Sequence, residues 1–304
     1  MKYSILIPAY NAEKYIERSI NSVLNQKTKY DYEIIICDDG STDNTVKIIN
    51  EIKSDKIKLI KNEENKRCVI TRKRLLLESQ GDYILWLDAD DEYSPKTLSI
   101  LDEYVSDNKY DIIELSLQYI YSNGERSFLI RENKTICEEN LLDLFFYKNP
   151  KWVLWGAAFK RDVALRKLPP DFNYIMDDVF FTLPIYYYSK NYISINSEPL
   201  YFYNYGIGYW TGDFYEKERM FTYDEFVHVL ENRKSEFDYN YHFLRENNAD
   251  EKYLYPLIEA CDLYSLVHFL IKINDFQERK KALNIFNNYF NLYLSPKIII
   301  EIMK

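Results

Sequence analysis

Hydrophobic and polar positions follow two different periods along the first third of the chain. Short apolar runs rich in β-branched residues predict buried strands, and each run precedes a segment whose apolar residues recur at helical spacing. Strands are expected at 3–10, 32–39, 56–62 and 82–88, and helices at 12–26, 41–53, 69–81 and 94–105. Asn11 and Ser94 are candidate helix caps, and Gly81 is the expected end of the third helix.

This alternation of strand and helix predicts a parallel sheet that is covered by helices on both faces. In such sheets, ligands bind at the carboxyl ends of the strands. Three polar clusters fall at those ends, namely PAYN at 8–11, DDGSTD at 38–43 and DADDE at 88–92. Loops collect polar residues anywhere, but three clusters at one edge of a sheet favour a binding site there.

The pattern changes after residue 110. Later elements are expected as a hairpin at 111–131, a helix at 138–147, a tryptophan-rich segment at 151–160, and helices at 251–273 and 278–294. The hairpin turns at Asn123–Gly124, a dipeptide typical of tight turns. The chain contains no internal repeat and no low-complexity linker, so a helical extension on one α/β domain is the expected organisation.

Charge, cysteines and histidines exclude several classes of protein. A net charge of −9 and a pI near 5.1 argue against nucleic-acid binding. Cys37, Cys68, Cys137 and Cys261 are too far apart in sequence for a metal or redox pair, and the three histidines show no ligand spacing. No apolar run reaches membrane-spanning length and the first residues are too few for a signal peptide, so a cytoplasmic protein with reduced thiols is expected.

The acidic clusters carry the candidate chemistry. Asp88 and Asp90 stand one residue apart at the end of a predicted strand, where alternate side chains point the same way. Two carboxylates on one side suit Mg²⁺ or Mn²⁺, ions that usually bind few protein ligands together with substrate phosphates. The alternative is an acidic loop tip without a ligand. The carboxylates of DDGSTD suit a base N–H or a ribose hydroxyl, with an Asp-rich turn and helix cap as the alternative.

Taken together, these stretches resemble the family 2 glycosyltransferases, which have a GT-A fold. The stretches are SILIPAYNAEKYIERSINSVLNQ, YEIIICDDGSTDNT, GDYILWLDADDEYSP and MDDVFF, and the resemblance covers roughly residues 1–205. It implies a Rossmann-like, mostly parallel sheet flanked by helices, with a C-terminal helical extension. The implied GT-A domain is 1–212, with a donor half at 1–110 and an acceptor half at 111–212. Residues 213–304 form the helical region.

The resemblance also implies roles for individual residues on the donor side. Pro8, Ala9 and Tyr10 match the segment that cradles the nucleotide base, usually uracil. Asp39 matches the acid that contacts the base. Arg72 matches a basic residue near the nucleotide and its diphosphate, although a solvated helix charge is the ordinary state of an arginine.

The reacting groups are implied in the same way. Asp88, Ala89 and Asp90 match the D-x-D motif, which contacts the nucleotide sugar, and Asp90 is the implied direct ligand of Mn²⁺ or Mg²⁺ with Asp88 beside it. Asp178 matches the catalytic base that removes a proton from the acceptor hydroxyl. The alternative for Asp178 is an acid that merely decorates a helix N-terminus, where the helix dipole favours negative charge.

Some positions depart from the family pattern. Arg67 stands where glycine is usual, Ala157 stands where lysine is common, and Asp177 stands where the family has glutamate. Trp155 and Asp177 are expected in the donor and acceptor cleft. Three further aromatic residues are expected to stack on sugar rings there, namely Trp152, Tyr209 and Trp210. The core is the alternative place for all four aromatic residues. These departures leave the implied fold intact and put the sugar specificity and the activity in question.

The implied activity is inverting transfer of a hexose or N-acetylhexosamine from a UDP-sugar to a glycan or lipid-linked glycan. Such enzymes build surface polysaccharide, capsule or lipooligosaccharide. Three alternatives stay open: transfer to a peptide side chain, sugar-nucleotide binding without turnover, and a role in an assembly complex. A nucleotidyltransferase is disfavoured because IPAYNAEKYI lacks a Gly-rich basic loop. A peripheral contact of the helical region with the cytosolic face of the inner membrane and a homodimer are also left open.

Overall fold

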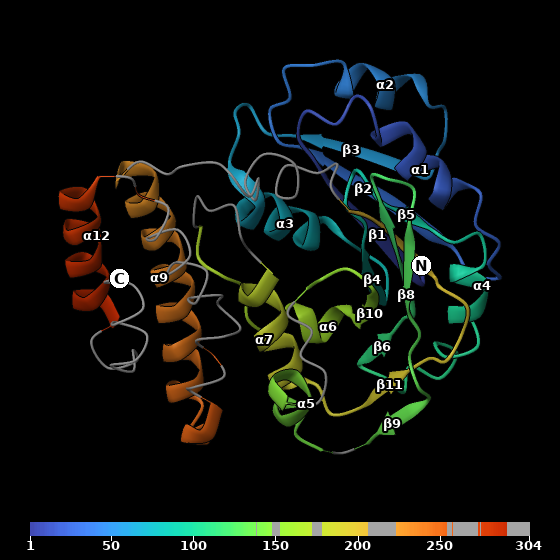
Figure 1. Cartoon of the computed structure of the whole chain (residues 1–304). Helices are drawn as coiled ribbons and strands as arrows, with labels where there is room; N and C mark the ends of the chain where they lie inside the picture. Colours follow the sequence, from blue (N-terminus) through green and yellow to red (C-terminus); the bar gives the residue numbers. More distant parts are fainter. Residues whose placement is uncertain are drawn as a thin grey trace. The chain divides into compact units, whose positions relative to one another are not determined.

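A computed structural model describes residues 1–137, 139–147, 153–171, 178–205, 223–253, 257, 273 and 275–290 (Figure 1). The chain divides into two compact units. The first unit comprises Met1–Leu141 and Val153–Phe214, and the second comprises Leu142–Trp152 and Tyr215–Lys304. The segment 142–152, which the sequence pattern places in the acceptor half, therefore groups with the C-terminal helices.

Eight strands of the first unit's described residues form one sheet in the order β3-β2-β1-β4-β10-β6-β11-β9. Neighbours β3, β2, β1 and β4 are parallel, β10 is antiparallel to both β4 and β6, β11 is parallel to β6, and β9 is antiparallel to β11. The strands are β1 Tyr3–Ala9, β2 Tyr32–Asp38, β3 Ile57–Lys61, β4 Tyr83–Trp86, β6 Ile112–Glu114, β9 Lys134–Ile136, β10 Ala157–Lys160 and β11 Tyr192–Ser194.

Helices cover both faces of the parallel part of this sheet, as the apolar runs predict. Ile5 and Ile7 of β1 pack in a core cluster with Ile16 and Ile20 of α1, and every residue of β2 is buried. In Figure 1, α1 and α2 lie on one side of the sheet and α3 lies on the other. The first unit's helices are α1 Ile16–Leu24, α2 Thr45–Glu51, α3 Arg67–Glu78, α4 Thr97–Leu101, α6 Arg161–Ala164 and α7 Asp178–Tyr188.

Three local predictions about helix ends are wrong. Asn11 does not cap α1, because its side-chain oxygen accepts a hydrogen bond from the Thr42 N–H at 2.9 Å. Ser94 does not cap α4, which begins at Thr97. Helix α3 ends at Glu78 rather than at Gly81, which instead lies so close to β1 that a Cβ there would stand 2.5 Å from a backbone carbon. Gly81 is therefore required by a close backbone approach.

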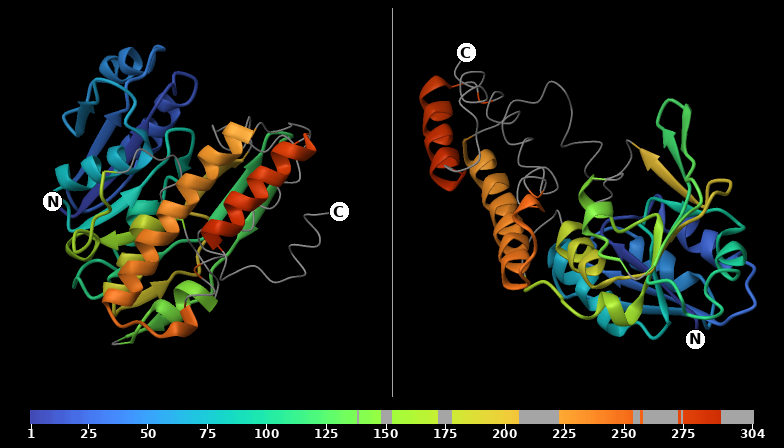
Figure 2. Two further views of the ribbon diagram at one scale, coloured as in Figure 1. Left: turned by 90° about the vertical axis from the view of Figure 1, so that its left-hand side faces the viewer. Right: turned by 90° about the horizontal axis from the view of Figure 1, so that it is seen from below.

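A second, four-stranded sheet stands in the order β5-β12-β7-β8. Its strands are β5 Glu92–Tyr93, β7 Leu117–Tyr121, β8 Arg126–Leu129 and β12 Tyr201–Tyr205. The predicted hairpin is confirmed over β7 and β8, with Gly124 in the left-handed region at φ +84° between them, whereas the first residues of the predicted range form β6 of the larger sheet. Figure 2 shows this hairpin in green beside β12 in yellow, and β12 also pairs with β5 directly after the DADD stretch.

The second unit contains helices, in agreement with the expected helical extension. They are α5 Leu142–Tyr147, α9 Tyr223–Glu246, a 3₁₀ turn at Glu251–Tyr253 and α12 Phe276–Phe290. Tyr253 donates a hydrogen bond to Asp143 at 2.7 Å and its ring stacks on Phe146, which ties α5 to the 3₁₀ turn. Within the described part of the chain, no helix is long and apolar enough to cross a membrane.

Candidate functional site

The loops that follow β1, β2 and β4 meet at the carboxyl edge of the sheet, as the sequence predicts. The Asp39 N–H donates to the Ala9 carbonyl at 2.8 Å, and the Asn11 N–H donates to the Ser41 hydroxyl at 2.9 Å. The Leu87 N–H continues the β4 ladder to Leu6 of β1. The polar clusters at 8–11, 38–43 and 88–92 therefore surround one end of the parallel strands.

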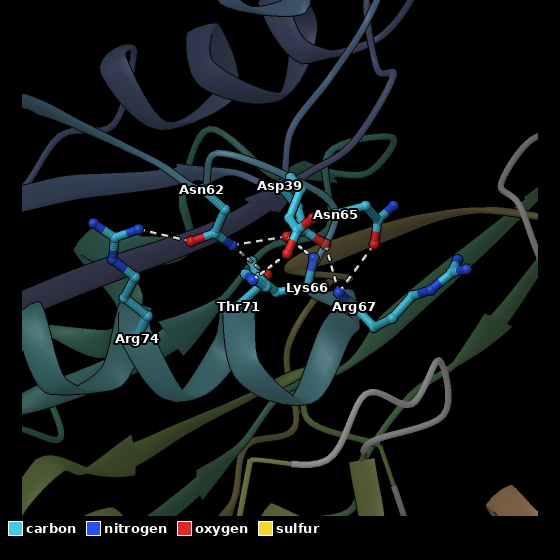
Figure 3. Close-up of polar contacts among 8 residues, drawn as sticks. Asp39, Asn62, Asn65, Lys66, Arg67, Thr71 and Arg74 are labelled. Atoms are coloured by element: carbon cyan, nitrogen blue, oxygen red, sulfur yellow. Dashed lines mark hydrogen bonds and ion pairs between the residues drawn. The ribbon is translucent and has the colours of Figure 1, made fainter.

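Asp39 is almost fully buried and holds the start of α3 (Figure 3). One carboxylate oxygen accepts hydrogen bonds from the Asn62 amide at 2.7 Å and the Lys66 N–H at 2.8 Å. The other accepts from the Arg67 N–H at 2.9 Å. A carboxylate has about four acceptor positions. Three are thus used inside the protein, and about one is left for a ligand such as a base N–H.

Arg67, which stands where glycine is expected from the family pattern, adopts a backbone conformation that favours glycine. Its φ is +69°, in the left-handed region that side chains rarely adopt. The bonds from its N–H to Asp39 and to the Asn65 side chain hold it there. Figure 3 shows the Arg67 side chain pointing away from Asp39. Arg67 is therefore held in a left-handed conformation by its N–H bonds and brings a cationic side chain to the start of α3.

Arg72 and Asp88 form a direct ion pair at the end of β4. The Arg72 Nη2 atom lies 2.8 Å from Asp88 Oδ1, and the Arg72 side chain is largely buried. Its guanidinium carbon lies 5.2 Å from the centre of the Trp86 ring. The sequence-predicted partners of the diphosphate are thus neighbours, and the indole face fixes the cation beside the acid turn, which we define as Asp88–Asp91.

Asp90 carries negative charge in a poorly solvated place. Burial, reinforced by the neighbouring Asp88 carboxylate, raises the pKa of Asp90 to about 6. Its main-chain oxygen accepts hydrogen bonds from Arg18 at 2.8 Å and from the Asn204 side chain at 2.9 Å. These bonds fix the backbone of Asp90, while its carboxylate receives no hydrogen bond from another described residue.

Asp91 is the functional candidate that sequence reasoning missed. Its side chain is fully buried, and it accepts hydrogen bonds from the Tyr201 hydroxyl at 2.6 Å and the Asn204 N–H at 2.7 Å. Burial, with the charges of Asp90 and Asp88, raises the pKa of Asp91 well above its usual range. The only sequence feature that pointed to Asp91 was that it is the third acid of the DADD stretch, directly before β5. Local spacing does not distinguish a buried acid at this position from a solvated one.

Asp178 begins α7, and its Oδ1 accepts a long hydrogen bond of 3.4 Å from the Leu154 N–H. This contact places it next to the segment that carries Trp155. The side chain is partly exposed. Asp177, predicted beside it, lies outside the described residues.

Trp155 belongs to a stack of aromatic rings. Its ring lies 4.7 Å from Tyr203 and 5.4 Å from Tyr201, nearly parallel to both. The half-buried indole packs on β12, which agrees in part with the alternative place in the core, and the cleft position stays a prediction. Trp152, Tyr209 and Trp210, which the sequence also suggests for this cleft, lie outside the described residues.

The other predicted residues occupy the same edge. Ala9 is buried, Pro8 is partly buried, and the Tyr10 ring is exposed next to the loop that carries Asp39. Ala89 is partly exposed within the acid turn. Ala157, where the family often has lysine, is a buried residue of β10 paired with Glu114 of β6.

Comparison with solved structures shows the same fold. Staphylococcus aureus TarS 1–349 in complex with UDP-GlcNAc aligns with a TM-score of 0.69, at 19% identity, over 95% of this chain and 81% of that one. The predicted GT-A fold is thereby confirmed.

Sequence relatives point the same way. The chain is 26% identical over 209 residues to the poly(ribitol-phosphate) beta-N-acetylglucosaminyltransferase TarS of S. aureus, covering 67% of this chain and 35% of TarS. It is 41% identical over 100 residues to the putative glycosyltransferase EpsE of Bacillus subtilis, covering 32% and 36%. The chain therefore spans well under half the length of these curated relatives. The profile described as Glycosyl transferase family 2 matches residues 4–165, more than half of the chain. The resemblance read from the sequence is confirmed: the chain belongs to glycosyl transferase family 2.

Proposed function

We propose that this protein is an inverting glycosyltransferase that moves a hexose or N-acetylhexosamine from a UDP-sugar to a glycan acceptor of a cell-surface polymer. The observation that carries the proposal is the coincidence of the family match over 4–165 with an acid turn at the carboxyl edge of the sheet. The names of the relatives, which include a hyaluronan synthase and a chondroitin synthase of Pasteurella multocida, support a polysaccharide-type acceptor.

The donor half supplies binding groups of the right chemistry for a nucleoside diphosphate. The exposed Tyr10 ring offers a flat face for a base, and Asp39 keeps about one acceptor position for a base N–H. Arg72, held against Trp86, brings fixed positive charge to the acid turn, where it can offset the repulsion between a diphosphate and the carboxylates.

The family implies a divalent cation, and the acid turn fits one. The Asp90 carboxylate is poorly solvated with a raised pKa, so a cation would relieve an unfavourable charge. Among the described residues, no three His, Cys, Asp or Glu side chains converge. Asp90 and Asp88 would therefore be the protein ligands, with phosphate oxygens and water as the rest. When bound, Mn²⁺ or Mg²⁺ supplies charge that neutralises the diphosphate leaving group.

Asp178 is the proposed general base. The positive end of the α7 dipole favours its ionised form, and its place beside Leu154 and Trp155 supports a role toward the acceptor. The acceptor oxygen bonds to the anomeric carbon while the bond from that carbon to the diphosphate oxygen breaks and UDP takes the electron pair. Asp178 receives the acceptor proton. One displacement inverts the configuration, so an α-linked donor gives a β-glycoside.

The proposal includes a cytoplasmic location, because sugar nucleotides are made in the cytoplasm. It also includes a lipid-linked form of the glycan acceptor as an equal alternative. Contact with the inner membrane surface and formation of a homodimer stay predictions from the sequence.

Thermal shift with UDP, GDP and CMP, each with and without Mn²⁺, tests the donor side. A ligand that binds only the folded state stabilises it by RT ln(1 + L/Kd), where L is the free ligand concentration. We expect UDP to raise the melting temperature more than GDP or CMP, and only with Mn²⁺ present. Absence of a shift with any nucleotide would contradict the proposal and favour a protein that has lost its donor site.

The Asp178→Asn variant tests the chemistry. This variant should abolish transfer, because a neutral amide is too weakly basic to take the proton of the acceptor hydroxyl. UDP binding should stay as in the wild type. Asp162→Asn is a matched control, because Asp162 is an exposed acid in the first turn of α6. Both changes remove one negative charge from the first turn of a helix, but the control should keep full turnover. Unchanged turnover in Asp178→Asn would remove Asp178 from the role of base.

A further inference from the structure

The acid turn has no regular structure of its own, yet it is bonded to a strand that comes much later in the chain. A hydrogen bond from the Asp91 N–H to the Asp88 carbonyl at 3.0 Å closes the turn. Asp91 then points inward, fully buried, and bonds to Tyr201 and Asn204 of β12. A carboxylate without exposed surface cannot touch a nucleotide or a metal, so its role differs from that of Asp88 and Asp90.

Tyr201 and Asn204 each make two bonds to the turn. The Tyr201 hydroxyl donates to Asp91 at 2.6 Å, and its oxygen also lies 3.4 Å from the Asp88 N–H, which donates to it. The Asn204 N–H donates to Asp91 at 2.7 Å, and the Asn204 side chain donates to the Asp90 carbonyl at 2.9 Å. Strand β12 therefore holds the main chain at both candidate metal ligands, with Asp91 as the common acceptor.

The same strand connects the turn to the acceptor side. The Tyr201 ring stacks on Trp155, and the residue before Trp155 bonds to Asp178 through its N–H. Directly after the turn, Tyr93 pairs with Tyr201 in the β5–β12 ladder, so the turn cannot shift along β12 without breaking that ladder. One rigid strand thus contacts the segments that carry both sets of proposed reacting residues.

We propose that Asp91 is a positioning residue: through Tyr201 and Asn204 it fixes the acid turn on β12 and so sets the affinity for a divalent cation together with a nucleoside diphosphate. The inference rests on the proposed function for the identity of the ligand. Arg72 holds the Asp88 side chain. Arg18 and Ser19 of α1 donate to the Asp90 and Asp88 carbonyls. The bonds from β12 add to this support and act against the repulsion between the two carboxylates in the absence of the cation.

The Tyr201→Phe variant tests the proposal, because it removes the bridging hydroxyl and keeps the ring that stacks on Trp155. Tyr3→Phe is the matched control. Tyr3 is equally buried, and its hydroxyl donates to the Asp102 carboxylate at 2.7 Å, in the part of β1 remote from the carboxyl edge. Both variants lose one buried tyrosine–carboxylate hydrogen bond, and Tyr201→Phe also loses the long bond from the Asp88 N–H, so the losses of stability are expected to be similar.

Two measurements separate positioning from general stability. Hydrogen exchange in the nucleotide-free protein should become at least about tenfold faster in the 87–93 peptide of Tyr201→Phe and stay unchanged there in Tyr3→Phe. The Kd for UDP with Mn²⁺, measured by calorimetry, should rise at least about tenfold in Tyr201→Phe only, since groups that orient metal ligands have effects of this size. Asn204→Ala, which removes only the bond to the Asp90 carbonyl, should change both quantities in the same direction by less.

The possible results are distinguishable. Equal exchange and equal Kd in Tyr201→Phe and Tyr3→Phe would overturn the positioning role. Faster exchange with an unchanged Kd would show that β12 holds the turn without setting ligand affinity, which also overturns the proposal. A wild-type protein without Mn²⁺-dependent UDP binding would overturn the proposed function and, with it, the role in ligand affinity, whereas the exchange result would still decide whether β12 holds the turn.

Discussion

The contact between Asp39 and the start of α3 predicts two separate losses in the Asp39→Asn variant. An asparagine keeps one acceptor oxygen for Asn62 and the Lys66 N–H, but it places its NH₂ group against the Arg67 N–H. One charge-assisted hydrogen bond is lost, and a donor then faces a donor. The variant should therefore lose stability at the start of α3 in addition to any loss of nucleotide binding.

The magnitude follows from the bonds involved. A hydrogen bond to a charged group contributes about 1.5–3 kcal/mol, and an anion at a helix N-terminus contributes about 0.3–1 kcal/mol. Together they predict a local destabilisation of about 2–4 kcal/mol. Since about 1.4 kcal/mol corresponds to a factor of ten, the Lys66 and Arg67 amides should exchange at least about 30-fold faster.

Hydrogen exchange of the nucleotide-free protein is the appropriate assay, because it reports the local opening directly. Asp43→Asn is the control in the neighbouring loop: Asp43 accepts hydrogen bonds from the Glu13 and Thr45 N–H groups, so faster exchange should appear there and not at Lys66. If Asp39→Asn abolished UDP binding while exchange at Lys66 and Arg67 stayed at the wild-type rate, the reasoning about the start of α3 would be refuted.

Three further predictions concern backbone strain and burial. Gly81→Ala should destabilise the protein by about 3 kcal/mol or more in a denaturant titration, because the added Cβ meets the β1 backbone at 2.5 Å. Gly124→Ala should lose about 1 kcal/mol from its positive φ alone, and equal losses in the two variants would contradict this reasoning. Arg67→Gly should change the free energy of unfolding by less than about 1 kcal/mol, because glycine relieves the strain of the left-handed backbone but makes the unfolded chain more flexible. A larger change in either direction in the same titration would contradict this. Burial raises the pKa of the Cys37 thiol to about 12. A thiol reagent at pH 8 should therefore label the exposed Cys137 in the native protein and Cys37 only after unfolding. Rapid labelling of Cys37 in the native protein would contradict its burial.

The parallel strands could be predicted from sequence because both of their faces are covered. A run such as IIIC at 34–37 in β2 is apolar at every position, and a polar loop follows the strand. The same reasoning placed Asp39, Asp88 and Asp90 at one edge, since the carboxyl ends of parallel strands must meet. These predictions needed only local pattern and a general rule of topology.

Long-range partners could not be predicted in this way. Asn11 has the side chain of a helix cap, but its bond goes to Thr42 in the next loop. Asp91 is one of three acids in a row, and its burial depends on Tyr201 and Asn204 in a distant strand. The residues next to Asp91 in sequence do not indicate its hydrogen bonds to Tyr201 and Asn204. The site was therefore predictable in its composition and its place, but not in what holds it together.

The position of β10 has a consequence for the newly synthesised chain. This strand is antiparallel to β4 and β6 and lies between them, although it follows β9 in sequence. Until Ala157–Lys160 leave the ribosome, β4 is the open edge of the parallel strands, and all four of its residues are ones that the mature fold buries. Because synthesis of the residues between β4 and β10 takes a time on the order of seconds, the edge of β4 stays unpaired for that time. During it, the edge can form hydrogen bonds with a strand of a second nascent chain. Aggregation during expression should therefore depend on how fast residues between β4 and β10 are translated, and a chaperone that shields this edge should matter most in that interval.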